Sequence, residues 1–326
     1  MLSRPVDILT RYPIRRSKQQ KTAFLEDAQI WFEKQDYPVS VENGKFGSRN
    51  LVIGDPQQAK YVVTAHYDTC AKMLFPNLLT PFNSVLFVLW QVFLTAGILL
   101  FAMLTGVLLA GATFFAAIHW APPDSGLMVA LVTLLVWYIG FVTSGSMLIL
   151  SMYFGPANKY NANDNTSGVV TLLEIARTMP ENQRHKVCFV LFDLEEKGLW
   201  GSKSYRKAYR EATDRQLVIN LDCVGDGDYI RMFPTKRLKK DRRKLTSLYK
   251  ACGYFGKKSI LVHEKGFGFN PSDHRNFPYG IGICALRKNK FGYYLGRIHT
   301  KKDTVLDEIN VNILRAAITT YICCDS

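Results

Sequence analysis

The sequence VCFVLFDLEE at residues 187–196 places six apolar residues directly before an acidic cluster. An apolar run without alternation is typical of a strand that is buried on both faces of a sheet. Comparable, nearly continuous runs occur at 61–65 (YVVTA), 217–221 (LVINL) and 281–286 (IGICAL). These four runs predict the buried centre of one β-sheet.

Helical patterns separate the apolar runs along the chain. They lie at 168–179, 200–212, 241–252 and 305–321, and a helical arm broken at Pro13 occupies residues 3–36. A further short β-rich run at 48–54 is expected to form a strand pair with the run at 61–65, across the turn-like Asp55-Pro56. The alternation predicts an α/β fold with a mainly parallel central sheet flanked by helices. Such sheets bind their ligands at the carboxyl ends of the strands.

One segment interrupts this alternation. Between Met73 and Asn158 there is no Lys or Arg, and the only acidic residue is Asp124. Two apolar stretches, at about 82–118 and 127–154, each exceed the ~20 residues that cross a ~30 Å hydrocarbon core. A pair of buried core helices is the alternative, but helices of soluble proteins usually have a polar face, which is almost missing here. We therefore expect two membrane spans.

The predicted insertion is a transmembrane helix hairpin at residues 81–154. It separates the N-terminal part of the globular domain, residues 1–80, from the remainder, residues 155–326. Because both parts supply strands to one sheet, they must lie on the same side of the membrane. The number of crossings is then even, and two is the simplest solution, with the long first helix tilted or extending beyond the bilayer.

The formal net charge of the chain is +14 at pH 7. No zinc finger, RNA-binding aromatic motif or long basic run accompanies this charge, so we expect no nucleic-acid partner. Anionic lipid headgroups attract juxtamembrane basic residues and explain the charge better. The seven cysteines lack CxxC spacing, and residues 1–12 contain no apolar signal segment, which favours reduced thiols and a cytosolic domain.

Potential metal ligands follow the predicted strands. They are His66 and Asp68 after the first run, Glu195 and Glu196 after the run at 187–192, and Asp222 after the run at 217–221, with Asp164 and His299 in loops. Two divalent ions about 3.5–4 Å apart repel each other, and a carboxylate between them offsets the repulsion. Asp164 is a candidate for that bridge. His and carboxylate ligands would complete both shells and leave space for water.

Six motifs in these regions resemble the M28 family of zinc peptidases. They are HYD at 66–68, NANDNTSGV at 161–169, FDLEEKGLWGS at 192–202, NLD at 220–222, SDH at 272–274 and HTKKDT at 299–304. The motifs follow the family's order and cover the chain outside the predicted hairpin. The resemblance implies an α/β/α zinc-peptidase sandwich, and the hairpin is a departure from the compact link that the family has at this place.

The resemblance also implies two Zn²⁺ ions and a role for each ligand. His66 and Asp222 are expected to hold one ion, Glu196 and His299 the other, and Asp164 to bridge them. Each ion would then have two ligands of its own and share a carboxylate with its neighbour.

Two further carboxylates have catalytic roles in the resemblance. Glu195 is expected to be the general base, which takes a proton from the attacking water and returns it to the leaving amine. Asp68 is expected to orient the His66 ring, as carboxylate partners of metal-bound histidines commonly do.

Asp273, in the SDH segment, has either a place near the substrate pocket or a structural role, and Asp303 is expected to support the His299 loop.

The predicted function is a membrane-anchored di-zinc metallopeptidase acting on peptides. An aminopeptidase is favoured, because one zinc can bind the free α-amine of a substrate. Two alternatives stay open: a noncatalytic membrane receptor or scaffold with this fold, and a single-zinc acyltransferase such as a glutaminyl cyclase. The sequence makes no prediction about oligomeric state.

The expected location is the cell membrane, with two helices crossing it. The connector at 119–126 contains no Lys or Arg, whereas Lys72 and Lys159 flank the two spans. Positive residues in short flanks normally remain cytoplasmic. This pattern predicts an external connector and a cytoplasmic catalytic domain.

Overall fold

The computed structural model describes residues 2–73, 75 and 78–324. These residues form one sheet in the order β1-β2-β4-β3-β5-β9-β6-β8-β7, with β10 paired to β9. The strands are β1 (Val39–Asn43), β2 (Arg49–Ile53), β3 (Tyr61–His66), β4 (Val187–Phe192), β5 (Leu217–Leu221), β6 (Tyr229–Pro234), β7 (Gly253–Phe255), β8 (Lys258–Val262), β9 (Gly280–Asn289) and β10 (Gly292–Tyr294).

The centre of the sheet consists of β4, β3, β5 and β9, which are parallel neighbours. These strands correspond to the four apolar runs of the sequence. The flanking pairs are antiparallel, except that β8 runs parallel to β6. The runs at 48–54 and 61–65 form β2 and β3, but β4 lies between these strands. Strands such as β6 and β8 escaped prediction, because Arg231 interrupts the apolar pattern of β6 and β8 begins with the polar residues Lys258 and Ser259.

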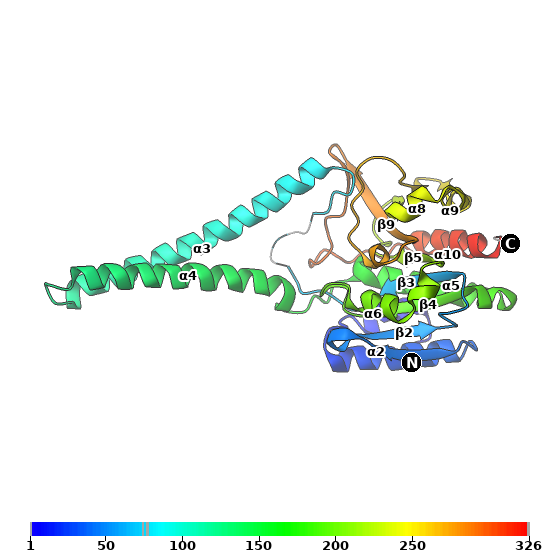
Figure 1. The fold of residues 1–326 in the computed structure, drawn as a ribbon, viewed down its shortest axis with the longest axis horizontal. Coiled ribbons are helices and arrows are strands. Elements are labelled where there is room, and N and C mark those ends of the chain that lie inside the picture. The colour runs from blue at the N-terminus through cyan, green and yellow to red at the C-terminus, as the bar shows by residue number, and fades with distance from the viewer. Residues whose placement is uncertain (1, 74, 76–77, 325–326) are drawn as a thin grey trace.

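Helices cover both faces of this sheet, as the sequence predicts (Figure 1). Outside the predicted hairpin they are α1 (Ile8–Arg11), α2 (Lys18–Glu33), α5 (Gly168–Thr178), α6 (Trp200–Ala208), α7 (Arg210–Thr213), α8 (Lys236–Lys240), α9 (Arg242–Leu248) and α10 (Glu308–Cys323). The helical arm expected at 3–36 therefore divides into α1 and α2 around Pro13.

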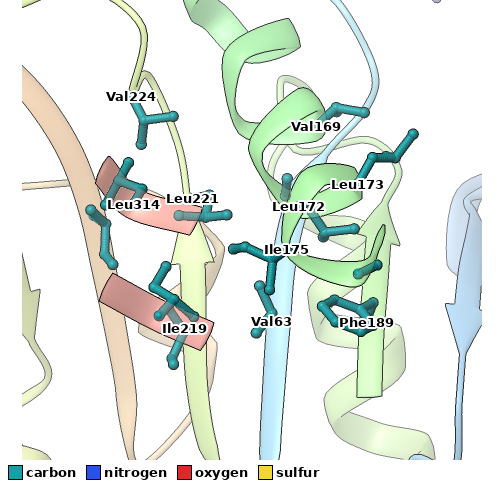
Figure 2. Packing of buried hydrophobic residues seen from close by; sticks show 14 of the residues in the cluster. Val63, Val169, Leu172, Leu173, Ile175, Phe189, Ile219, Leu221, Val224 and Leu314 are labelled. Atoms are coloured by element: carbon teal, nitrogen blue, oxygen red, sulfur yellow. The ribbon is translucent and has the colours of Figure 1, made fainter. Parts of the chain in front are cut away.

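Side chains of the central strands alternate between two hydrophobic cores, because successive strand residues point to opposite faces. Val63 and Ile219 belong to the larger core, where they lie beside α5 (Figure 2). Val62 and Val218 belong to the core on the other face, together with Tyr205 of α6. Full burial of each such aliphatic side chain contributes about 1.5–3 kcal/mol. The two cores fix the strands, and with them the positions of the strand ends.

The predicted hairpin consists of α3 (Ser84–Trp120) and α4 (Gly126–Phe154), which project together from the sheet domain (Figure 1). A methyl group at Gly106 of α3 would lie 2.8 Å from the carbonyl oxygen of Trp137, so the two backbones approach closely through a small residue. Both helices are long and apolar enough to cross a membrane, and only 11% and 6% of their most apolar windows are buried. The helices diverge toward the sheet domain (Figure 1).

Candidate metal centre

Three strand ends bring the predicted ligands to one edge of the sheet. His66 is the last residue of β3, and Asp222 directly follows β5. Glu195 and Glu196 lie just beyond β4. Since β3, β4 and β5 are parallel neighbours, their carboxyl ends meet at the same edge. All four side chains are therefore placed together by strand pairing.

Asp164 approaches this edge from a turn that precedes α5. The backbone N–H groups of Asn163 and Asp164 donate to the carboxylate of Asp303, at 2.7 and 3.0 Å. The neighbouring Asn165 accepts a hydrogen bond from the backbone N–H of Cys223 at 3.2 Å, which ties the turn to the residue after Asp222. Asp303 thus supports the Asp164 turn directly, and its own loop carries His299.

The five predicted ligands form two groups that share Asp164. Nε2 of His66 lies 3.4 Å from Oδ1 of Asp164 and 3.6 Å from Oδ1 of Asp222. Nε2 of His299 lies 2.9 Å from Oδ2 of Asp164 and 3.3 Å from Oε2 of Glu196. The two carboxylate oxygens of Asp164 therefore face different groups, each of which contains one histidine and one further carboxylate.

These distances fit metal ions placed between the ligand atoms. Ligands about 2.0–2.2 Å from a tetrahedral zinc are separated from each other by roughly 3.4 Å. Oε1 of Glu196 and Oδ1 of Asp222 are buried and have no hydrogen-bond partner among the described residues. Buried carboxylate oxygens without partners are costly unless a cation compensates them. The nitrogen and oxygen donor set is of the kind that zinc binds.

The proton affinities of the two histidines reflect the same excess of negative charge. Burial lowers the pKa of His66, but Glu195 and then Asp164 and Asp222 raise it more, so that it lies well above its usual value. Burial also lowers the pKa of His299, whereas Glu196 and the other acidic neighbours raise it further, to a net increase. The carboxylates therefore stabilise positive charge at the position of each ring.

Asp68 contacts both the first histidine and the acidic turn. Nδ1 of His66, on the ring edge opposite the ligand groups, lies 3.2 Å from the backbone carbonyl oxygen of Asp68 and 3.5 Å from its Oδ1. Its carboxylate also accepts hydrogen bonds from the backbone N–H groups of Glu195 and Glu196, at 3.1 and 3.3 Å. Asp68 is thus positioned to fix the ring of His66 and the backbone of both glutamates, a second contact that the sequence did not reveal.

The SDH segment lies outside both ligand groups. Asp273 accepts a hydrogen bond from the Ser202 hydroxyl, and burial raises its pKa to about 7. Ser272 accepts a hydrogen bond from the Asn220 amide at 2.8 Å. Burial lowers the pKa of the adjacent His274 to about 3, which keeps the imidazole neutral. These contacts favour the structural role, and none of Ser272, Asp273 and His274 is among the residues that line the two cavities at the centre.

Sequence reasoning missed Cys70 at this site. The Cys70 thiol forms a cluster with Glu196 and His299, in which all three potential ligand atoms lie within 4.8 Å of one another. The residue is buried, and burial raises the pKa of its thiol far above the usual value. The one available signal was its position two residues after Asp68. The structure contains free cysteines, as the odd number without CxxC spacing predicted.

Comparisons with known structures identify proteins of similar fold. The fold resembles a glutaminyl cyclase from Porphyromonas gingivalis (TM-score 0.58, 15% identity, 98% of this chain and 96% of that chain covered). It also resembles a Zn-dependent exopeptidase from Parabacteroides distasonis (TM-score 0.56, 16% identity, 98% and 94% covered). A third similar structure is the LapA aminopeptidase of Legionella pneumophila (TM-score 0.55, 15% identity, 98% and 69% covered).

These structural likenesses establish the fold, since the sequence identities are low. A comparison with curated proteins finds no match. The model of peptidase family M28 matches residues 150–322, more than half of the chain, and this range includes five of the six motifs. The sequence motifs, the strand-end ligands and this match lead to one conclusion: the chain belongs to peptidase family M28.

Proposed function

We propose that this protein is a membrane-anchored di-zinc aminopeptidase. The observation that carries the proposal is the orientation of Asp164, whose two carboxylate oxygens face two separate ligand groups. A shared carboxylate is what a pair of closely spaced divalent ions requires. In this assignment His66 and Asp222 hold one ion, and Glu196 and His299 hold the other.

The zinc ions, when bound, would lower the pKa of a bound water and polarise the scissile carbonyl group. Glu195 would remove the proton from that water and later deliver it to the leaving amine. Its carboxylate lies in one cluster with His66 and Glu196, whose potential ligand atoms are within 4.8 Å of one another, and Glu195 lines both cavities at the centre. Asp68 would hold the Glu195 backbone in place through the 3.1 Å hydrogen bond.

The completeness of the ligand set favours this proposal over the two alternatives. A single-zinc acyltransferase needs only one ligand group, whereas two groups share Asp164 here. A noncatalytic receptor has no requirement for Glu195 beside the ligands. The structural likeness to a glutaminyl cyclase concerns the fold, which many unrelated activities can share.

The aminopeptidase assignment predicts strong discrimination between a peptide and its N-acetylated twin. A free α-amine can bind at the centre, and a site built around such a group rejects an analogue that lacks it. We expect kcat/KM to fall by at least about 100-fold on acetylation. The measurement is release of the N-terminal residue, with total peptide loss followed in parallel by mass spectrometry.

Equal cleavage of the two peptides would contradict the exopeptidase assignment and leave an endopeptidase. Absence of cleavage of either peptide by zinc-loaded protein would contradict peptide hydrolysis itself. Treatment with a chelator, followed by return of zinc, provides the control that links activity to the metal.

We also propose that residues 81–154 are a membrane hairpin inserted between residues 1–80 and 155–326. In support, large apolar side chains such as Leu108 (73% exposed) and Leu127 (77% exposed) face outward along α3 and α4. Exposure of this kind costs free energy in water and stabilises a helix in lipid. The lipid bilayer is therefore the proposed partner of the hairpin.

The charge pattern predicts that the connector lies outside and the metal centre inside the cell. A Cys introduced by Ser125→Cys, in a background without other reactive cysteines, should react with a membrane-impermeant maleimide in intact cells. A Cys introduced by Glu26→Cys, on the exposed face of α2, should react only after the cells are opened. The reverse labelling pattern would place the metal centre outside.

A further inference from the structure

The two helices of the hairpin contribute walls to the cavities at the metal centre. Met152 and Tyr153, near the end of α4, line a cavity of about 590 Å³ that includes Glu195. Phe87 and Gln91, near the start of α3, line a second cavity of about 330 Å³ that also includes Glu195. The hairpin is thus part of the site as well as an anchor, and one helix lines each cavity.

The segment before α3 contacts the His299 loop, and the N-terminal arm holds the end of α4. The backbone N–H of Met73, in the segment that leads to α3, donates to the carbonyl oxygen of His299 at 2.9 Å. The guanidinium group of Arg16 donates to the carbonyl oxygens of Tyr153 at 2.6 Å and of Gly155, both at the end of α4. The Arg16 contacts therefore attach the end of α4 to the globular domain beside the larger cavity.

The apolar surface of the hairpin continues to these bases. Val85 and Val92 of α3 are 67% and 58% exposed, and Phe154, the last residue of α4, is 68% exposed. With 37 and 29 residues, the helices are about 55 and 43 Å long. A bilayer with its headgroup layers is about 40–45 Å thick. A bilayer that covers α4 therefore reaches Phe154, and with it the rim of the cavity.

Three cationic side chains are among the residues that line the larger cavity beside the end of α4. They are Arg16, Lys197 and Arg275, of which the last two are exposed. The Lys197 ammonium group lies 5.7 Å from the ring centroid of Phe154. Basic residues next to an apolar membrane helix are attracted to the anionic headgroup layer. The cavity mouth therefore lies where the apolar surface ends and the headgroups begin.

We propose that the substrates are polypeptides whose free N-terminal residue lies within a few residues of a membrane-embedded segment. Such an N-terminus would enter between the diverging bases of α3 and α4, at the depth of the headgroup layer. Gln91 is the one amide side chain in α3 and lines the smaller cavity, where it offers hydrogen-bonding groups to a peptide backbone. This inference rests on the proposed aminopeptidase function and on its membrane anchoring.

The test uses the wild-type, zinc-loaded protein in lipid nanodiscs that contain an anionic phospholipid. Two substrates carry the same N-terminal residues and the same transmembrane helix, joined by spacers of about 4 or about 20 residues. These spacers reach at most ~14 and ~70 Å from the membrane. A soluble peptide with the same N-terminus is the third substrate. Release of the N-terminal residue is measured for all three.

We expect kcat/KM of the short-spacer substrate to be at least one third of the long-spacer value. If the soluble peptide is cleaved but the short-spacer kcat/KM is less than one third of the long-spacer value, the proposal is overturned, because the site would then stand above the headgroups. Failure of the soluble peptide and of both anchored substrates would instead contradict the proposed aminopeptidase function. The two failures are therefore distinguishable.

A matched pair of variants provides a second measurement. Leu89→Asp introduces a charge on the outward side of α3, at a residue that is 59% exposed and is not among those lining the two cavities. Val41→Asp introduces the same charge on β1, at 40% exposure. We expect Leu89→Asp to lower short-spacer cleavage at least tenfold relative to soluble-peptide cleavage, and Val41→Asp to leave this ratio unchanged. An unchanged ratio in both variants would overturn the proposed depth.

Discussion

Glu195→Gln should retain both zinc ions and lose turnover by about 10²–10⁴-fold. The amide keeps the size and much of the hydrogen-bonding shape of the carboxylate, but it cannot accept the proton of the attacking water. The Glu195 side chain forms a cluster with His66 and Glu196 and lines both cavities at the centre. The measurements are kcat on an unblocked peptide and zinc content by elemental analysis of the same preparation.

The matched control is Glu196→Gln, one residue further along the same turn. Oε2 of Glu196 lies 3.3 Å from Nε2 of His299, so this variant should lose zinc occupancy as well as activity. Both glutamates are held by Asp68 through their backbones, and therefore a general distortion of the turn would affect the two variants alike. Zinc loss in Glu195→Gln with full zinc in Glu196→Gln would mean that base and ligand are exchanged.

Asp164→Asn should weaken both zinc sites at once. Wild-type protein is expected to bind two zinc ions per chain, and each carboxylate oxygen of Asp164 faces one ligand group. An amide is a weaker ligand and carries no charge to offset the repulsion between the ions. We expect zinc affinity to fall by more than the 10–100-fold typical of outer-shell changes, and peptide hydrolysis to be lost. Titration calorimetry and elemental analysis measure the two occupancies.

Asp222→Asn is the comparison for this variant. Oδ1 of Asp222 lies near His66, and Asp222 contributes to only one of the two ligand groups. Its replacement should lower occupancy toward one ion per chain, whereas Asp164→Asn lowers it further. Equal stoichiometry in the two variants would contradict the bridging role. Wild-type protein that saturates at one ion would contradict the di-zinc proposal as a whole.

The sheet and the ligand positions were largely predictable because both follow from local pattern. A strand buried on both faces is apolar along its whole length, and β4 and β5 have this property. Polar residues directly after such strands, such as Asp222, must then lie at one edge of a parallel sheet. Strands β6 and β8 at the flank were missed, because the buried Arg231 interrupts the apolar pattern of β6 and β8 begins with the polar residues Lys258 and Ser259.

Other contacts at the site were not predictable, because they join residues that are distant in the sequence. The carboxylate of Asp68 reaches the backbone of Glu195, 127 positions away, only because β3 and β4 are adjacent and in register. The grouping of Cys70 with Glu196 and His299 likewise depends on how two loops meet. No periodicity in the chain encodes such distances.

The sequence by itself determined the α/β class, the apolar hairpin segment and the identities of the candidate ligands. These features depend on hydrophobic periodicity and on the order of residues along short segments. Only the tertiary structure decided that the two oxygens of Asp164 face different groups. Only the structure placed Phe87 and Tyr153 of the hairpin in the walls of the cavities. The physical reason is that a side chain's direction and its distant neighbours are set by strand register and by the packing of both cores.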